Sequence, residues 1–324
     1  MRLGLTYDLQ TDPDDERQAE FDPPRTIEAL TAALASLGHA VVPIGDAAAL
    51  ASWLPRREPI DLIFNIAEGS GGRCREAVVP ALLEASGVPY AGSGPWALAL
   101  GLDKVMSKRL AAAAGIATPH WFSLEPSAAV PESLPCAFPM IVKPRHEGSG
   151  MGIDEGAIVR DRASLAARAQ TLWARHPQPL LVEEFIDGGE LTVLVIGNDP
   201  PVAYPPIQRP IDVRTRLACH VLRGPCESWE APLALTPELD ARARQAALAV
   251  FEAIGCRDVA RLDFRVDGQG RLWFLEINPL PSFDPEGTFG LLAESMELTY
   301  AHLIGRVLDA ALLRITNDQI PSSR

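Results

Sequence analysis

The segment from Val259 to Pro281 constrains the fold of this chain more than any other, because its pattern predicts an antiparallel hairpin. Two runs of alternating polar and apolar residues flank the tetrapeptide Asp267-Gly-Gln-Gly270, which has the composition of a tight turn. If the middle two residues of that tetrapeptide form the loop, Asp263 lies opposite Phe274. Side chains alternate between the faces of a strand, so the polar residues of both runs gather on one face. They are Arg261, Asp263, Glu276 and Asn278.

The polar face of this hairpin has the chemistry of a cation site. Carboxylate and amide oxygens are ligands that magnesium prefers, and it usually leaves its other positions to water and substrate phosphates. The same register places Arg261 opposite Glu276, which favours a bound anion beside the cation, and turns Leu275 to the opposite face. A surface hairpin with a cross-strand arginine–glutamate pair is the alternative that this pattern leaves open.

The first hundred residues alternate short apolar strands with helical patterns, as in a parallel sheet flanked by helices. We expect strands at 2–7, 40–44 and 60–66, and helices at 26–37 and 76–85. The uncharged stretch 85–102 is interrupted by glycine and proline. It therefore predicts a buried, turn-rich connection rather than a membrane span.

Further lobes are expected after about residue 100, where Asp103 begins a new helix. The central part predicts a helix at 162–175 and strands at 179–186 and 190–196. The last part predicts a strand at 202–208, a helix begun by Thr236-Pro237, the hairpin and a closing helix at 299–313. The fold class is α/β with three lobes, at residues 1–100, 101–186 and 187–316, followed by a polar, frayed tail at 317–324.

The charge and cysteine pattern exclude several classes of protein. A formal charge of -13 and a pI near 5.0 argue against nucleic-acid binding, which needs a concentrated basic surface. The five cysteines are an odd, scattered number without paired ligand spacing, which fits reduced thiols in a cytoplasm. Neither a secretory leader nor a transmembrane helix is recognisable, so we expect a cytoplasmic protein that does not bind membranes.

Two segments carry nucleotide chemistry. The segment from Lys143 to Gly152 follows an apolar strand and has glycines at alternate positions, so its exposed amides favour a phosphate, with a flexible hairpin as the alternative. The segment from Leu181 to Glu190 offers strand amides, carbonyls and carboxylates that suit an adenosine. Taken alone, the second segment favours an ordinary edge strand with solvated acids over a nucleotide site.

In their combined order these motifs resemble the ATP-grasp superfamily, specifically its D-alanine–D-alanine ligase branch. The resemblance covers about residues 60–315. The matching segments are Gly87-Val-Pro-Tyr-Ala-Gly-Ser-Gly94, Leu102-Asp-Lys-Val-Met-Ser-Lys108, Ile141-Val-Lys-Pro144, Glu147-Gly-Ser149, Ala260-Arg-Leu-Asp263 and Leu275-Glu-Ile-Asn278. The resemblance implies an ATP-grasp fold with an N-terminal parallel α/β domain, a central α+β lid and a C-terminal α+β domain with an antiparallel sheet.

The resemblance also implies an ATP-dependent carboxylate–amine ligase that joins small amino acids. In such an enzyme a carboxylate attacks the γ-phosphate of ATP, and an amine then opens the acyl phosphate. The D-alanine dipeptide is the default product. The implied cofactors are ATP and two Mg²⁺ ions, with Mn²⁺ as a substitute, and the implied assembly is a homodimer.

Residue roles follow from the same resemblance, position by position. The nucleotide contacts would be Lys104, Lys143, Glu147, Ser149, Glu183, Glu184, Phe185, Ile186, Glu190 and Leu275. Asp263, Glu276 and Asn278 would bind the metal ions. Arg261 would stabilise charge on the acyl phosphate, and the loop around Ser149 would close over the phosphates.

The substrate end departs from the family pattern. Glu20 is the nearest candidate for the glutamate that anchors the first amino acid, with a solvated loop acid as the alternative. A segment that contains Glu68 and Arg75 replaces the family's His-Gly motif and offers groups for a zwitterion or a second carboxylate. Ser282 and Thr288 are the hydroxyl donors in a run whose acidic pair would repel an unshielded carboxylate.

The mobile loop departs as well, because arginines stand where the family has a lysine and a tyrosine. Either Arg214 or Arg216 replaces that lysine, or both are solvated loop residues. These departures leave three functions open: a D-alanine–D-alanine ligase-like enzyme, a specialised ligase for another amino acid, amine or carrier-borne substrate, and a non-catalytic nucleotide-binding module.

Overall fold

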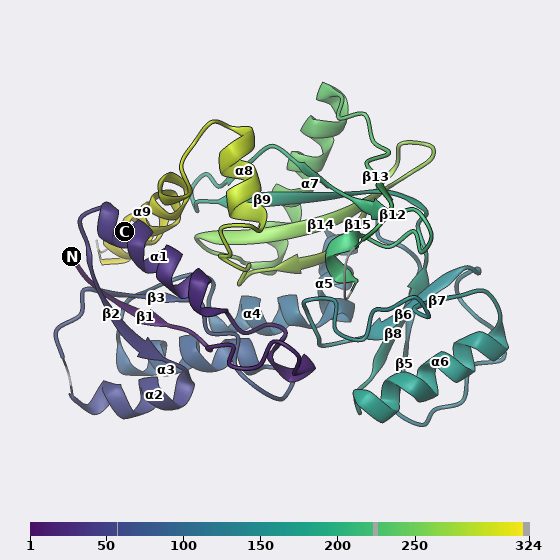
Figure 1. The fold of residues 1–324 in the computed structure, drawn as a ribbon, viewed down its shortest axis with the longest axis horizontal. Helices are drawn as coiled ribbons and strands as arrows, with labels where there is room; N and C mark the ends of the chain where they lie inside the picture. Colours follow the sequence, from purple (N-terminus) through teal and green to yellow (C-terminus); the bar gives the residue numbers. More distant parts are fainter. Residues whose placement is uncertain (57, 223–225, 320–324) are drawn as a thin grey trace, which may run out of the picture.

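The computed structural model describes residues 1–56, 58–222 and 226–319 of the 324-residue chain. Three sheets organise the molecule (Figure 1). The N-terminal sheet lies at the lower left of that view, a smaller sheet with helix α6 (Arg162–Arg175) at the lower right, and a long sheet above and between them. The predicted boundaries of the three lobes stay a prediction.

The N-terminal sheet is parallel, as the alternating pattern predicted, with the order β2-β1-β3-β4. Its strands are β1 (Arg2–Thr6), β2 (Ala40–Gly45), β3 (Leu62–Asn65) and β4 (Tyr90–Ala91). The helices beside it are α1 (Pro24–Ser36), α2 (Ala47–Trp53) and α3 (Val78–Ser86).

Two helices of the first hundred residues were not predicted from the sequence. Helix α2 is short and depends on the Asp46 side chain, which accepts the N–H of Ala49 at 2.8 Å. Helix α4 (Pro95–Leu102) occupies the stretch expected to be a turn-rich connection. Most of α4 is buried and apolar, so it shows no polar face whose periodicity could reveal a helix.

The smaller sheet is antiparallel, with the order β5-β8-β6-β7. Its strands are β5 (Trp121–Leu124), β6 (Met140–Pro144), β7 (Ile158–Val159) and β8 (Leu180–Glu184). Helix α6 has the bounds that the sequence predicted and packs Leu165 and Leu172 into the same core as Val142. Asp161 begins the helix, because its side chain and that of Ser164 cap it reciprocally.

The long sheet is antiparallel, with the order β10-β9-β14-β15, and β11 also pairs with β9. Its strands are β9 (Gly188–Ile196), β10 (Val202–Ala203), β11 (Ile207–Arg209), β14 (Val259–Asp267) and β15 (Leu272–Asn278). A short ribbon of β12 (Ile211–Asp212) and β13 (Trp229–Glu230) accompanies it. The remaining helices are α5 (Lys104–Ala113), α7 (Pro237–Ile254), α8 (Thr288–Ser295) and α9 (Tyr300–Gln319).

The hairpin β14–β15 exists, but its predicted register was wrong. Asp263 lies opposite Glu276, not Phe274, and Arg261 lies opposite Asn278, not Glu276. A β-bulge at Asp263/Phe264 produces the shift, and the turn takes four residues between Asp267 and Leu272 rather than two.

The prediction that Leu275 faces away from the polar side chains of the hairpin was also wrong. The bulge turns Leu275 so that it lines a cavity together with Glu276. Phe274 takes the buried position and packs against Phe264 with 5.9 Å between ring centroids. A bulge leaves no mark in the polar and apolar alternation, so the sequence alone did not reveal it.

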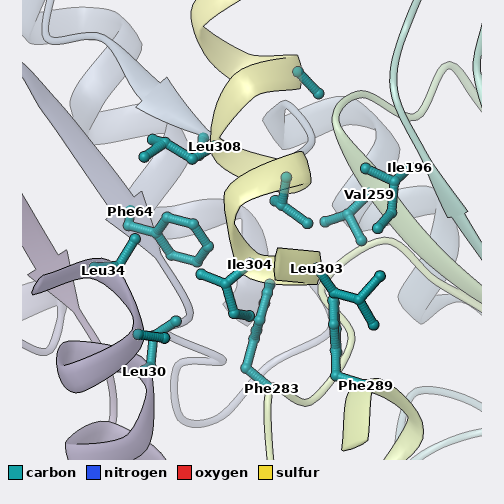
Figure 2. Packing of buried hydrophobic residues seen from close by; sticks show 14 of the residues in the cluster. Leu30, Leu34, Phe64, Ile196, Val259, Phe283, Phe289, Leu303, Ile304 and Leu308 are labelled. Atoms are coloured by element: carbon teal, nitrogen blue, oxygen red, sulfur yellow. The ribbon is translucent and has the colours of Figure 1, made fainter. Parts of the chain in front are cut away.

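One hydrophobic core joins the N-terminal sheet to the long sheet, with α9 running between them (Figure 2). Its labelled residues come from the N-terminal lobe, the long sheet and the C-terminal segment: Leu30, Leu34, Phe64, Ile196, Val259, Phe283, Phe289, Leu303, Ile304 and Leu308. Phe283 contacts Phe64 edge-on at 5.3 Å and stacks on Phe289 at 4.8 Å between ring centroids. These contacts fix the loop that carries Ser282.

Two other predictions need correction. Cys219 and Cys226 form a disulfide, whereas all five cysteines were expected to be reduced; Cys74, Cys136 and Cys256 are free. Their Cα atoms lie 5.7 Å apart, a pairing that scattered cysteines do not reveal in a sequence. Helix α9 continues to Gln319 into the expected tail, whose last residues, 320–324, lie outside the described part. Among the described helices none has the length and apolarity needed to cross a membrane.

Candidate functional site

Two adjoining cavities lie where the three sheets meet. The smaller is an apolar slot of about 70 Å³, and the larger is a polar cavity of about 400 Å³. Glu276 lines both, as do His220 and Val221. One strand-end carboxylate therefore faces the slot and the polar cavity at once.

The slot has the walls expected for a flat heteroaromatic ring. Its apolar lining comes from the smaller sheet, the long sheet and the loop after β12: Ile141, Ile153, Phe185, Ile186, Leu217 and Leu275. The guanidinium of Arg265 lies 5.3 Å from the centre of the Phe185 ring, which holds that ring in place.

All six residues expected to meet an adenosine line the slot: Glu183, Glu184, Phe185, Ile186, Glu190 and Leu275. Within this set Glu183 acts differently from the expectation. Its buried carboxylate contacts the ammonium groups of Lys143 and Lys108, each at 2.7 Å. Burial favours the neutral acid, but the two lysines overcome it and lower the pKa of Glu183. Glu183 therefore positions Lys143, one of the expected phosphate ligands.

Lys108 and Arg265 were missing from the site predicted from the sequence. Lys108 is fully buried, and burial lowers its pKa to about 8. It stands four residues after Lys104 on the same helix, a spacing that places both on one face. Arg265 contacts Glu190 at 3.1 Å and would have been found by continuing the alternation of β14 two residues beyond Asp263.

The predicted polar face of the hairpin is confirmed despite the different register. Arg261 and Asn278 both line the polar cavity with Glu276. Arg261 contacts Asp263 on its own strand at 3.0 Å, so the structure does not favour the alternative of a cross-strand pair between Arg261 and Glu276. Glu276 instead contacts Lys104 at 3.4 Å.

The donor set of this face fits a hard divalent cation. Two carboxylates stand opposite each other at Asp263 and Glu276, and the amide of Asn278 lies beside them. Burial would raise the pKa of Glu276, but Lys104, Lys143 and Arg261 lower it to about 2, so the group is ionised. Ionised carboxylate and amide oxygens are the ligands that magnesium takes.

The glycine-rich loop borders the polar cavity through Gly148, Ser149 and Gly150. Gly148 donates its N–H to Glu20 at 2.8 Å. Gly150 has a φ of +69°, and a Cβ there would lie 2.8 Å from the carbonyl oxygen of Val221. The loop is thus held between the N-terminal part of the chain and the segment that ends at Val221.

Of the remaining predicted residues, Glu20, Glu68 and Ser282 line the polar cavity, whereas Arg75 and Glu147 do not. Arg75 is buried and contacts Glu20 at 2.5 Å and Glu147 at 3.2 Å. Its guanidinium joins the N-terminal lobe to the glycine-rich loop through these two ion pairs. Arg75 is therefore engaged within the protein and is not open to a substrate carboxylate.

The structure does not bring the other loop candidates to the site. Arg214 pairs with Glu155 on the surface, and Arg216 contacts Asp187 at 2.9 Å. Neither lines either cavity, so their reading as a replacement for the lysine is not supported. Thr288 is buried, accepts a hydrogen bond from Arg209 and does not line the polar cavity.

Three acids that line the polar cavity were not among the predicted site residues: Asp22, Glu76 and Asp284. Burial raises the pKa of Asp22 to about 7 and that of Glu76 to about 8. The sequence signal was present in the acid-rich loop before Pro23 and in the segment that ends at Glu76, but neither belongs to a family motif.

Comparison with known proteins gives a match over most of the chain. The family model described as D-ala D-ala ligase C-terminus matches residues 110–309. The uncharacterized protein y4sG of Sinorhizobium fredii is 33% identical over 306 residues, 89% of this chain and 87% of that protein. The D-alanine–D-alanine ligase of Xanthomonas axonopodis pv. citri is 33% identical over 287 residues, 86% of this chain and 87% of that enzyme.

Solved structures share the fold at lower identity. The D-alanine–D-alanine ligase of Bacillus anthracis, complexed with ATP, has a TM-score of 0.77 and 24% identity, covering 98% of this chain and 99% of that one. The VanG D-Ala:D-Ser ligase of Enterococcus faecalis has a TM-score of 0.75 and 18% identity, covering 96% and 99%. The expected three-lobed architecture is therefore confirmed.

Proposed function

The chain belongs to the D-alanine–D-alanine ligase family of ATP-grasp enzymes, and we propose on that premise that it uses ATP to join a small amino-acid carboxylate to an amine. One observation carries the proposal: Glu276 faces both an apolar slot and a polar cavity. A nucleotide in the slot would extend its phosphates past Glu276 to substrates in the cavity.

The slot supports the nucleotide half of this function. An adenine would lie between Phe185 and Leu275, and Glu190 would accept hydrogen bonds from the ribose. Lys143 and Lys104 would contact the phosphates, since Lys143 lines the slot and Lys104 lines the cavity.

Asp263, Glu276 and Asn278 would hold two Mg²⁺ ions, or Mn²⁺ in their place. When bound, such ions neutralise the repulsion between anions and polarise the transferred phosphoryl group. Lys104 and Arg261 lie at the same face and supply fixed positive charge beside them.

The chain's own residues support an acyl-phosphate route. A substrate carboxylate beside Ser149 and Arg261 would attack the γ-phosphorus, and ADP would leave. The deprotonated amine would then attack the carbonyl carbon, form the C–N bond and expel phosphate. Arg261 would stabilise the negative charge of the acyl phosphate and of the tetrahedral species, because its guanidinium is fixed by Asp263 before reaction.

The first test is phosphate release from ATP and Mg²⁺ with a panel of D-amino acids, L-amino acids and their pairs. We expect release that depends on an amino acid and falls to background in Glu276→Ala, since that carboxylate faces both cavities. ATP binding without release from any substrate would instead indicate a non-catalytic nucleotide-binding module.

A specialised ligase with a different second substrate is the second candidate. The observation in its favour is that Thr288, one of the two hydroxyls expected to bind the second carboxylate, is buried and does not line the polar cavity. A carrier-borne substrate, a homodimer and a cytoplasmic location stay predictions from the sequence.

A further inference from the structure

The polar cavity holds more carboxylates than its cations can pair. The acids in its wall are Glu20, Asp22, Glu68, Glu76, Glu276 and Asp284. Half of them are paired: Glu20 with Arg75 at 2.5 Å, Glu276 with Lys104 at 3.4 Å, and Asp284 with Arg25 at 2.8 Å.

The other acids, Asp22, Glu68 and Glu76, receive no side-chain hydrogen bond or ion pair from any residue that the structure describes. Asp22 and Glu76 are each only 7% exposed, and both line the cavity. A buried carboxylate without a partner costs free energy, so this wall is arranged for a positive group that the protein does not supply.

The raised pKa values of these three acids agree with the absence of a cationic partner among the described residues. Burial, together with the charges of Asp284 and Asp8, raises the pKa of Asp22 to about 7. Burial and the neighbouring Glu20 raise the pKa of Glu76 to about 8, and burial and Glu76 raise the pKa of Glu68 well above its usual range. A bound cation would reverse these shifts by favouring the ionised forms.

The protein's own cations at this cavity are already engaged. Arg25 contacts Asp284 and Glu286, Lys104 contacts Glu276, and Arg261 contacts Asp263. No group of three or more acidic, histidine or cysteine side chains in the described part of the chain is arranged to hold a metal ion. The unpaired acids are therefore suited to an extended organic cation.

A simple amino acid, with one ammonium group and one carboxylate, does not neutralise the unpaired acids of the cavity. Its α-ammonium group would form an ion pair with one of the unpaired acids, while its free carboxylate would be repelled by the others. A second cationic group on the same molecule, a few carbon atoms away, would pair with another of these acids and offset the repulsion of the carboxylate.

We propose that one of the two substrates is a diamino acid or a diamine, whose second ammonium group binds among Asp22, Glu68 and Glu76. This inference rests on the proposed ligase function and specifies its substrate class. In the reaction one neutral amine attacks the carbonyl carbon of the acyl phosphate, the C–N bond forms, the C–O bond to the phosphate breaks, and the proton that the amine loses leaves with the phosphate. The second amine stays protonated and forms no bond, because the unpaired carboxylates hold it as a cation.

Binding tests the site without requiring turnover. We would measure thermal shifts with ornithine, 2,4-diaminobutyrate and putrescine against norvaline, 2-aminobutyrate and butylamine, in both stereochemical forms where they exist. The variants are Asp22→Asn and Glu76→Gln, which keep the shape and remove the charge, with the exposed Glu125→Gln as the matched control. We expect larger shifts from the compounds with two ammonium groups than from their analogues with one, a difference that disappears in the two variants and persists in the control.

Turnover then separates this inference from the ligase function. We expect phosphate release, with a product identified by mass, at least about tenfold more efficient with a diamine or diamino acid than with its analogue that lacks the second amine. Release that is equal or better with the analogues would overturn the inference and leave the ligase function standing. Shifts that require the second amine, without release from any pair, would support the cation site and overturn the ligase function. Shifts that are unchanged in both variants would overturn the inference, whatever the turnover.

Discussion

At the scale of single residues, Glu183 organises the nucleotide end of the site. The carboxylate is almost fully buried and lies 2.7 Å from both Lys108 and Lys143. Two cations around one anion leave a net positive charge beside the slot, which is where phosphates of a nucleotide would need it. Lys108 acts through Glu183, because its own side chain reaches neither cavity.

We predict that Lys108→Met lowers the free energy of unfolding by about 3 kcal/mol, because it leaves a buried carboxylate with one lysine instead of two. Lys143 would then be held more tightly by Glu183, and the KM for ATP should rise. Urea unfolding and ATP kinetics measure the two effects. Arg109→Met, on the exposed side of the same helix, is the control; equal midpoints for the two variants would contradict the prediction.

At the scale of elements, the sequence predicted strands and helices well wherever one face differs from the other. Helix α6 and the polar face of β14 and β15 have this property, and both predictions were confirmed. Helix α4 is apolar on all sides, and the bulge in the hairpin changes no residue type, so neither left a signal. The interpretation of Arg214 and Arg216 as phosphate ligands failed for a different reason. The sequence of a loop does not distinguish an arginine that binds a ligand from one that pairs with a surface carboxylate.

The glycine-rich loop provides a prediction at this scale. Gly150→Ala should lower the free energy of unfolding by about 1 kcal/mol, because alanine resists a positive φ and its Cβ would meet the carbonyl of Val221. The loop would then sit farther from the phosphates, and the KM for ATP should rise. Gly268→Ala, where a Cβ meets open space, is the control. Kinetics indistinguishable between the two variants would rule out close packing of this loop.

At the scale of the whole molecule, the shared core in Figure 2 ties the N-terminal sheet to the long sheet and so fixes the distance between their loops. This arrangement brings acids from distant parts of the chain to one cavity, from Asp22 to Asp284. The sequence could not reveal their convergence, since it depends on packing between residues more than two hundred positions apart. Because like charges are buried together in this cavity, the arrangement lowers the stability of the fold.

The cost should appear in the pH dependence of stability. The pKa values of Asp22 and Glu76 are raised in the folded state, to about 7 and about 8, so folding is penalised as pH rises from their unfolded values through their folded ones. Asp22→Asn and Glu76→Gln should therefore stabilise the protein little at about pH 5 and more at about pH 9. The gain is about 1.4 kcal/mol for each unit of pKa shift removed.

Thermal unfolding across this pH range, with Glu125→Gln as the reference, measures the difference. A stabilisation that is the same at both ends of the range would mean that these carboxylates keep ordinary pKa values in the folded protein.

The chain has only three lysines, Lys104, Lys108 and Lys143, and all are buried at the candidate site. Every other permanent side-chain cation is an arginine, which reagents directed at amines do not modify. Apart from the α-amino group, acylating agents therefore find primary amines in this protein only by entering the site. A nucleotide bound there would shield Lys104 and Lys143, which line the two cavities, and leave the α-amino group as the accessible target of such reagents.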